Sequence, residues 1–158
     1  MGRRIGLPGL TIIFTPILMP EKVFLDASYA IALASSKDIY HSRAAQLASK
    51  LQAEDAVLVT TRAVVLEIGN ALSKQRYRST AVRLLLSLEA DPRVEIKLLT
   101  DPLYFRALHL FQQREDKEWG LTDCISFVVM TDERITAALT ADGHFRQAGF
   151  RALLLDEF

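Results

Sequence analysis

Four acidic residues stand in segments that a folded chain could bring together: Asp26, Glu67, Asp123 and Asp142. No lysine or arginine in their immediate motifs is placed to pair with them one to one. If the four carboxylates converged, their mutual repulsion would destabilise the cluster unless it bound a cation. Oxygen ligands suit hard ions such as Mg²⁺ or Mn²⁺, and the three histidines of the chain show no zinc-like spacing.

A divalent ion held by carboxylates in a cleft is suited to the hydrolysis of phosphodiester bonds. The ion lowers the pKa of a water, orients the phosphate and stabilises the developing negative charge. One of the carboxylates can accept the proton of the water. We therefore predict that the four acids form a catalytic metal site whose cofactor is Mg²⁺ or Mn²⁺.

The elements that would position these acids alternate along the chain. Short apolar runs predict strands at residues 22–26, 56–60, 94–99, 135–140 and 152–155. Spacings of three and four residues and helix-start signals predict helices at 27–34, 40–53, 62–75, 80–89, 101–116 and 122–132. Because the strands are continuous apolar runs, we expect an α/β fold, a three-layer α/β/α sandwich with a mostly parallel central sheet.

This fold would bring the acids to one edge of the sheet. Asp26 closes the first strand, and Asp142 follows the fourth strand by two residues. Glu67 shares the inward stripe of the helix after the second strand, and Asp123 lies in the first turn of an apolar helix. Ligands of open α/β sheets bind outside the carboxyl ends of the strands, so we expect the four side chains to meet there.

Each acid also has an ordinary structural interpretation. Asp26 could cap the following helix, and Asp142 could belong to an Asp-Gly turn. Asp123 could favour a helix dipole, with Thr122 as the cap. Glu67 is harder to explain in this way, because the inward face of a helix disfavours a lone charge. The joint placement of the four at one edge favours the functional interpretation.

A basic segment contains Lys74, Arg76, Tyr77 and Arg78 and no acid. Its cations could contact RNA phosphates while the tyrosine stacks on a base. The alternative is a solvated helix end whose cations favour the helix dipole. His144, in the last acidic segment, could also touch a phosphate, although an exposed loop residue is the simpler interpretation.

The overall composition limits the possible classes of protein. The 158 residues suit one domain, and the 19 basic and 19 acidic side chains cancel, so no global field attracts a polyanion. RNA binding would therefore depend on a local patch or on metal. Cys124 is the only cysteine and lies in an apolar run, which predicts a buried thiol, no internal disulfide and a reducing, cytoplasmic location.

Residues 1–21 are expected to form an irregular extension, and residues 22–158 the functional domain. Prolines at positions 8, 16 and 20 interrupt the apolar stretch, and no small-residue cleavage site follows it. We therefore expect neither a signal peptide nor a membrane anchor. Met19, just before the first strand, is a possible natural start of translation.

Four motifs in order resemble those of the PIN-domain nucleases, above all the VapC-like toxins of bacterial toxin–antitoxin pairs. They are Val-Phe-Leu-Asp26-Ala-Ser28, Leu-Glu67-Ile-Gly-Asn70, Trp119-Gly-Leu-Thr-Asp123 and Leu-Thr140-Ala-Asp142-Gly-His144-Phe145. The resemblance covers about residues 22–156, nearly the whole chain. The apolar extension has no counterpart in the family pattern.

The resemblance implies a metal-dependent endoribonuclease with the four acids as its site. It implies that Ser28 supports the water at the metal and that Asn70 is a polar position after the glutamate. It also implies an RNA substrate, a homodimer and an antitoxin whose tail occupies the acidic groove. The alternatives are a non-catalytic RNA- or protein-binding module, an RNA-processing nuclease outside toxin–antitoxin systems, and a metal-dependent phosphatase or phosphotransferase.

Overall fold

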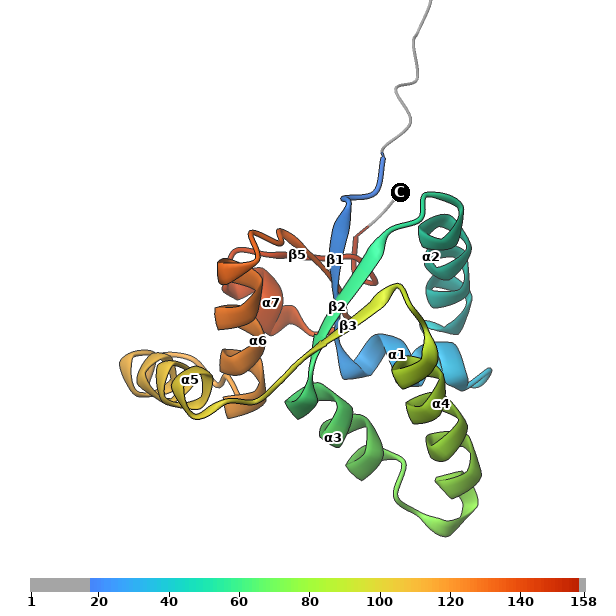
Figure 1. The fold of residues 1–158 in the computed structure, drawn as a ribbon, viewed down its shortest axis with the longest axis horizontal. Coiled ribbons are helices and arrows are strands. Elements are labelled where there is room, and N and C mark those ends of the chain that lie inside the picture. The colour runs from blue at the N-terminus through green and yellow to red at the C-terminus, as the bar shows by residue number, and fades with distance from the viewer. Residues whose placement is uncertain (1–17, 157–158) are drawn as a thin grey trace, which may run out of the picture.

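A five-stranded parallel sheet forms the centre of the computed structural model, which describes residues 18–156 (Figure 1). The strand order is β3-β2-β1-β4-β5, and every neighbouring pair is parallel. The strands are β1 (Lys22–Leu25), β2 (Val57–Thr61), β3 (Val94–Lys97), β4 (Ala137–Leu139) and β5 (Arg151–Ala152). The predicted α/β class with a parallel sheet is confirmed.

Helices cover both faces of the sheet and complete the expected three-layer sandwich. Figure 1 shows α1, α2 and α4 on one side, α5, α6 and α7 on the other, and α3 below the sheet. Their bounds are α1 (Ala27–Ala34), α2 (His41–Ala53), α3 (Arg62–Ala71), α4 (Arg78–Ala90), α5 (Asp101–Gln113), α6 (Leu121–Asp132) and α7 (Gly143–Gln147), with a 3-10 turn, η1 (Gln75–Tyr77), before α4.

The pattern of burial explains why the central strands are continuous apolar runs. Val23 and Phe24 of β1 and all three residues of β4 are completely buried, because helices pack on both sides of them. The outer strand β3 is only partly buried, and its Glu95 and Lys97 make ion pairs along the sheet edge. Charged side chains at an edge disfavour pairing with another sheet. Helix α6 is buried from Cys124 to Met130, as its apolar sequence predicts.

The helix starts agree only in part with the sequence analysis. The expected helix start at residue 101 is confirmed, and the hydroxyl oxygen of Thr100, just before it, accepts the N–H of Leu103 at 3.3 Å. The expected cap of α6 at Thr122 is wrong, because the helix begins after Gly120. Neither η1 nor α7 was predicted. Helix α7 is too short for a periodic signal, and its Asp142-Gly start is also a turn sequence.

The carboxyl ends of β1 and β4 lie side by side, and the region outside these two ends is the topological crevice of the sheet. After β1 the chain adds β2 and β3 on one side, and β4 and β5 then pair on the other side. The strand order therefore reverses between β1 and β4, and ligands of such sheets bind at this switch point. Asp26 follows β1 and Asp142 follows the β4 strand, so the crevice lies between two of the predicted site residues.

The predicted extension lies largely outside the described part of the chain, since residues 1–17 are not described. Residues 18–21 form no helix or strand, and the backbone N–H of Met19 donates to Glu54 Oε2 at 2.7 Å. Between residues 18 and 156, no helix is both long and apolar enough to span a membrane.

Candidate active site

Asp26 directly follows β1, and only 7% of its surface is exposed. Its Oδ2 accepts hydrogen bonds from the hydroxyls of Thr140, at 2.7 Å, and Ser28, at 3.0 Å. Although Asp26 precedes α1, its side chain makes no capping hydrogen bond to that helix. The structural alternative for Asp26 as a helix cap is therefore wrong.

The two hydroxyls join the ends of β1 and β4 around this carboxylate. Ser28 Oγ accepts the N–H of Ala141 at 2.9 Å, and Thr140 Oγ1 accepts the N–H of Asp142 at 3.0 Å. Each hydroxyl thus accepts from the backbone after β4 and donates its hydrogen to Asp26, which fixes the carboxylate. The family resemblance implied a supporting position for Ser28, whereas no role was predicted for Thr140, although it lies in the same motif as Asp142.

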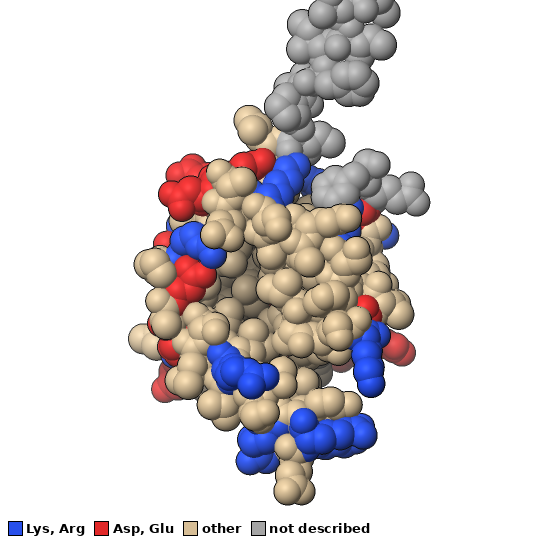
Figure 2. All heavy atoms as spheres, turned by 90° about the vertical axis from the view of Figure 1, so that its right-hand side faces the viewer, with Lys and Arg blue, Asp and Glu red and all other residues tan. Residues whose placement is uncertain are grey.

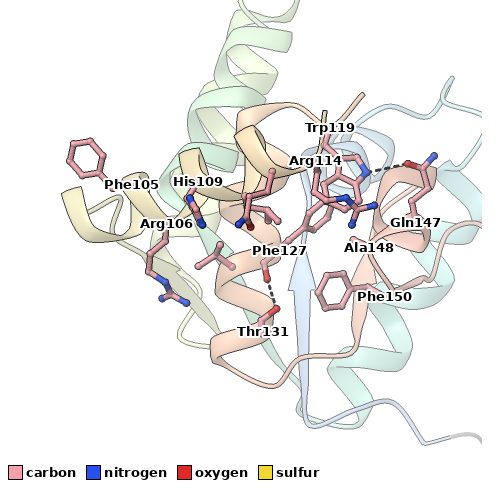
Figure 3. A pocket seen from close by; sticks show the side chains of 13 residues that line it. Phe105, Arg106, His109, Arg114, Trp119, Phe127, Thr131, Gln147, Ala148 and Phe150 are labelled. Carbon is pink, nitrogen blue, oxygen red and sulfur yellow. Dashed lines mark hydrogen bonds between the residues drawn. The ribbon is translucent and has the colours of Figure 1, made fainter. Parts of the chain in front are cut away.

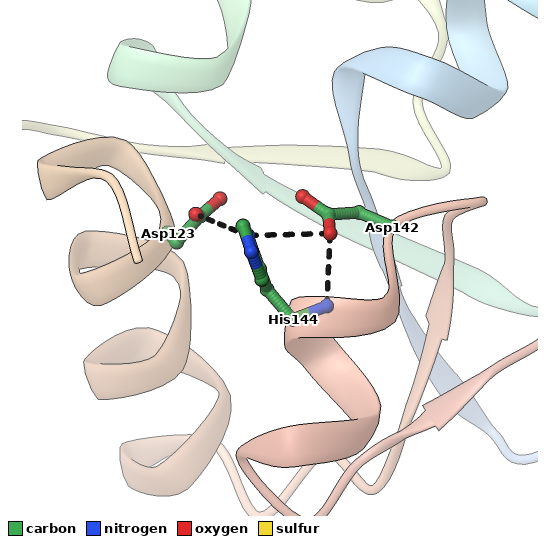
Figure 4. Close-up of side chains that lie close together, drawn as sticks. All are labelled: Asp123, Asp142 and His144. Carbon is green, nitrogen blue, oxygen red and sulfur yellow. Dashed lines mark hydrogen bonds and ion pairs between the residues drawn. The ribbon is translucent and has the colours of Figure 1, made fainter. Parts of the chain in front are cut away.

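Asp123, Asp142 and His144 form a compact group at the mouth of the crevice (Figure 4). Nδ1 of His144 lies 3.3 Å from Asp123 Oδ2 and 3.3 Å from Asp142 Oδ1. Asp123 Oδ2 also accepts the N–H of Gly120 at 2.9 Å, which fixes the first turn of α6. Asp142 Oδ1 accepts the N–H of His144 at 2.8 Å and so caps α7. The sequence Asp142-Gly143, which was interpreted as a possible turn, is thus the start of a short helix that Asp142 caps.

His144 differs from its expected position on an exposed loop. It lies in α7, only 31% of its side chain is exposed, and its ring points between the two carboxylates in Figure 4. The expectation of an exposed loop is wrong because Asp142 begins a helix here, and the first turn of that helix turns the imidazole back toward α6.

Glu67 approaches the site from α3. The buried face of this helix is formed by Val64, Val65 and Ile68, whereas Glu67 and Ala71 are exposed. The expectation that Glu67 lies on the inward face of this helix is therefore wrong, because the buried face is rotated away from Glu67 by part of a helical turn. Glu67 borders the apolar face, which allows its carboxylate to reach the crevice without being enclosed in the core.

The charges of the four acids act on one another. Glu67 is exposed as a residue but partly screened from water by its neighbours, and this partial burial, followed by the charges of Asp26, Asp123 and Asp142, raises its pKa to about 7. Burial also raises the pKa of Asp26 and of Asp123, and further negative charge from Asp123 and Asp142, respectively, acts in the same direction. The structure therefore brings the four predicted acids into one electrostatic cluster.

Other residues that the sequence singled out are not members of this group of charges. Asn70 is exposed and lines, with Glu67, a hollow of about 330 Å³. Asp116, another acid of the segment before α6, is exposed and makes a two-point ion pair with Arg114 at 2.9 and 3.0 Å. Cys124 is fully buried as expected, and burial raises the pKa of its thiol.

The predicted basic segment lies on the surface at the same end of the molecule. Lys74, Arg76, Tyr77 and Arg78 are all exposed, on η1 and at the start of α4. The guanidinium of Arg76 stacks over the ring of Tyr77, 4.7 Å from its centre. Figure 2 shows lysine and arginine side chains gathered at the lower end of the molecule, where Figure 1 places η1.

A second hollow, of about 620 Å³, lies between α5, α6 and α7 (Figure 3). Aromatic side chains such as Trp119, Phe127 and Phe150 line it, and Trp119 Nε1 donates to Gln147 Oε1 at 3.1 Å. None of its lining residues is acidic. This hollow therefore contributes no carboxylate to the acid cluster.

The donor set of the crevice fits a divalent cation. Carboxylates with raised pKa values gather there, and an opposite charge would lower those values again. In addition, Nδ1 of His144 is buried and has no hydrogen-bond partner among the described residues. Its contacts are the ion-pair distances of 3.3 Å to Asp123 and Asp142, and a cation bound among the three groups would satisfy this nitrogen and both carboxylates.

Comparison with known proteins defines the class of this protein. The family model of the PIN domain matches residues 23–151. The chain therefore belongs to the PIN-domain family, and the resemblance found in its sequence is confirmed.

Among its relatives are VapC toxins. The chain is 30% identical over 129 residues to the 23S rRNA-specific endonuclease VapC20 of Mycobacterium tuberculosis, a match that covers 81% of this chain and 95% of the relative. The crystal structure of that VapC20, described as a sarcin–ricin loop cleaving toxin, superposes with a TM-score of 0.72 at 26% identity and the same coverage. The chain is thus a PIN-domain ribonuclease of the VapC type.

Thr140→Val tests the hydroxyl that fixes Asp26. We expect RNA cleavage to fall about tenfold or more, because loss of a group that orients a metal-binding carboxylate has effects of this order. The matched control is Thr60→Val, since Thr60 is equally buried and donates to Leu25 O at 2.7 Å. Both variants should lose about 1 kcal/mol of unfolding free energy, but only Thr140→Val should lose activity. Equal activities in the two variants would contradict this role.

Proposed function

We propose that the chain hydrolyses RNA with Mg²⁺ or Mn²⁺ and is the toxin of a toxin–antitoxin pair. The observation that carries the proposal is the cluster of Asp26, Glu67, Asp123 and Asp142 at the switch point of a PIN-domain sheet. The test is cleavage of purified RNA by the full chain with Mn²⁺, with Mg²⁺ and in chelator. Binding of RNA without cleavage in any of these conditions would favour a non-catalytic module instead.

When bound, the divalent ion activates the attacking water and stabilises the negative charge that develops on the phosphate. Asp26, Asp123 and Asp142 would hold the ion, and Ser28 and Thr140 keep Asp26 in position through its Oδ2. Glu67, beside the other three acids, can accept the proton of the attacking water, because the positive charge of a bound ion would lower its raised pKa and keep its carboxylate ionised. The P–O bond to the leaving oxygen then breaks as the new P–O bond forms.

The RNA substrate of the VapC20 relative guides the choice of test substrate. That protein is named for its action on 23S rRNA, and its structure is described as a toxin that cleaves the sarcin–ricin loop. We propose a structured ribosomal RNA as the first substrate to try with this chain. We propose that the exposed basic segment holds the RNA backbone, and its exposed cations at the same end of the molecule as the acids support this role.

The triple variant Lys74→Gln, Arg76→Gln and Arg78→Gln tests the basic segment. We expect KM for RNA to rise about tenfold at 0.1–0.2 M salt while kcat changes little, because phosphate contacts contribute binding that depends on salt. The control is Arg134→Gln, an exposed cation before β4 at the opposite edge of the sheet. An unchanged KM, with an unchanged salt dependence, would assign the segment to a solvated helix end.

The surface beside the acid cluster is suited to a protein partner. Beside Glu67, the hollow of about 330 Å³ is lined by the partly exposed Leu66, Leu99 and Tyr104. An exposed apolar surface next to a catalytic site is suited to a protein that blocks it. We propose that this protein is a segment of an antitoxin, which co-purification with the neighbouring gene product can test. We also propose a homodimer, which light scattering of the free chain can test, and a cytoplasmic location.

A further inference from the structure

Helix α7 presents the imidazole of His144 to the acid cluster in a defined direction. Asp142 caps the helix through the backbone N–H of His144, at 2.8 Å, so the histidine is fixed at the first turn. Its side chain then passes between Asp142 on one side and Asp123 of α6 on the other (Figure 4). Three ligand atoms, one from each residue, all lie within 4.8 Å of one another.

The spacing of these atoms suits a shared ion. Two ligands at right angles, each about 2.1 Å from one ion, lie about 3 Å apart. The contacts of Nδ1 with Asp123 Oδ2 and Asp142 Oδ1, both 3.3 Å, are close to that separation. The same nitrogen is buried without a hydrogen bond. Coordination of an ion would give it a partner.

We propose that Nδ1 of His144 is a ligand of the divalent ion together with Asp123 and Asp142, and that it favours Mn²⁺ over Mg²⁺. The inference rests on the proposed metal-dependent function and adds a nitrogen donor to an otherwise oxygen-only site. Mg²⁺ prefers oxygen ligands and loses its waters reluctantly, whereas transition ions accept imidazole nitrogen. Removal of the imidazole should therefore weaken the binding of Mn²⁺ more than the binding of Mg²⁺.

A different role is compatible with the same position. A protonated His144 could serve as a counter-cation that neutralises the two carboxylates and is displaced when the ion binds. Removal of a competing cation would leave metal affinity unchanged or increase it. Removal of a ligand decreases the affinity and abolishes the magnetic coupling between the ion and a ring nitrogen. The two roles therefore predict opposite results.

The experiment measures Mn²⁺ and Mg²⁺ binding to the full chain by calorimetry, and ¹⁴N coupling to bound Mn²⁺ by electron spin echo spectroscopy. The variants are His144→Ala and His144→Asn, with His109→Ala on the exposed face of α5 as the control. Circular dichroism checks that each variant folds. We expect Kd for Mn²⁺ to rise about tenfold or more in both His144 variants, in line with the loss of a group at a metal site. Kd for Mg²⁺ should change by less than about threefold, since its preferred ligands are oxygens.

The spectroscopic result decides between the roles. Imidazole ¹⁴N coupling in the wild type and in His109→Ala, absent from both His144 variants, is the expected outcome. Mn²⁺ binding without ¹⁴N coupling in the wild type, or unchanged or tighter Mn²⁺ binding in His144→Ala, overturns the inference but leaves the proposed function intact. A wild-type chain that binds neither ion overturns the proposed metal dependence, and the inference with it.

Discussion

Asp26→Asn should abolish RNA cleavage while leaving the fold intact. Removal of one group that stabilises charge in a transition state costs on the order of 10²–10³-fold in rate, and Asp26 is the most buried acid of the cluster. The asparagine oxygen can still accept the hydroxyls of Thr140 and Ser28, so the surrounding structure should persist. Steady-state cleavage of ribosomal RNA and thermal unfolding in chelator measure the two effects.

Asp116→Asn provides the matched control for this prediction. It is the same chemical change at an exposed residue whose partner, Arg114, keeps it away from the cluster. Its cleavage rate should stay within about twofold of the wild type, as surface changes usually do. In chelator, Asp26→Asn should also melt at or above the wild-type temperature, because burial disfavours the charged form of Asp26. Residual activity of Asp26→Asn near the wild-type rate would refute the assigned site.

Removal of the metal should have the second large effect. Chelator should stop cleavage, and Mn²⁺ or Mg²⁺ should restore it. An ion at 100 times its Kd stabilises the folded state by about 2.7 kcal/mol, which for a domain of this size is about 5–10 °C in melting temperature. Thermal scans with and without the ion, and cleavage assays on the same samples, measure both. Cleavage that persists in chelator would contradict the metal-dependent mechanism.

The metal-free protein should lose stability as the pH rises. The pKa of Glu67 increases from 4.5 to about 7 on folding, chiefly through burial and then through the charges of its neighbours. The folded state therefore binds the proton more tightly than the unfolded state, so the added stability is present below pH 4.5 and is lost as the pH rises through about 7. Glu67→Gln should flatten this dependence, and saturating Mn²⁺ should offset it. A melting temperature that increases between pH 5 and 7.5 would show that the acids do not repel one another.

Much of the fold can be predicted from the spacing of apolar residues and from the residues that begin and end helices and strands. The apolar strands and the amphipathic helices were placed within a few residues, except that α3 ends at Ala71 rather than at Gln75. Propensity could not reveal η1 or α7, because each spans a single turn or little more. Tertiary contacts hold such short segments: Phe145 of α7 is fully buried and packs edge-to-face on Phe127 at 5.0 Å.

The members of the site were predictable from the sequence, but their contacts were not. Asp26 and Asp142 could be placed because any parallel strand ends at the same edge of the sheet. Thr140 and His144 stood in the same motifs, yet nothing in the sequence showed where their side chains point. Glu67 was predicted to face inward, but the buried residue is the next one, Ile68, and Glu67 lies beside the buried face.

The amino-acid sequence alone determined the class of fold, the four acids and their meeting at one edge, because strand direction and helix periodicity are local properties that the chain carries everywhere. Only the tertiary structure decided the hydrogen bonds at Asp26 Oδ2 and the position of the His144 nitrogen between Asp123 and Asp142. The hydrogen bond from Thr140 joins residues 114 positions apart, and the position of His144 depends on the packing of α6 against α7. A change of a few tenths of an ångström in the separation of such groups makes or breaks the contact, and that separation depends on how the whole core packs.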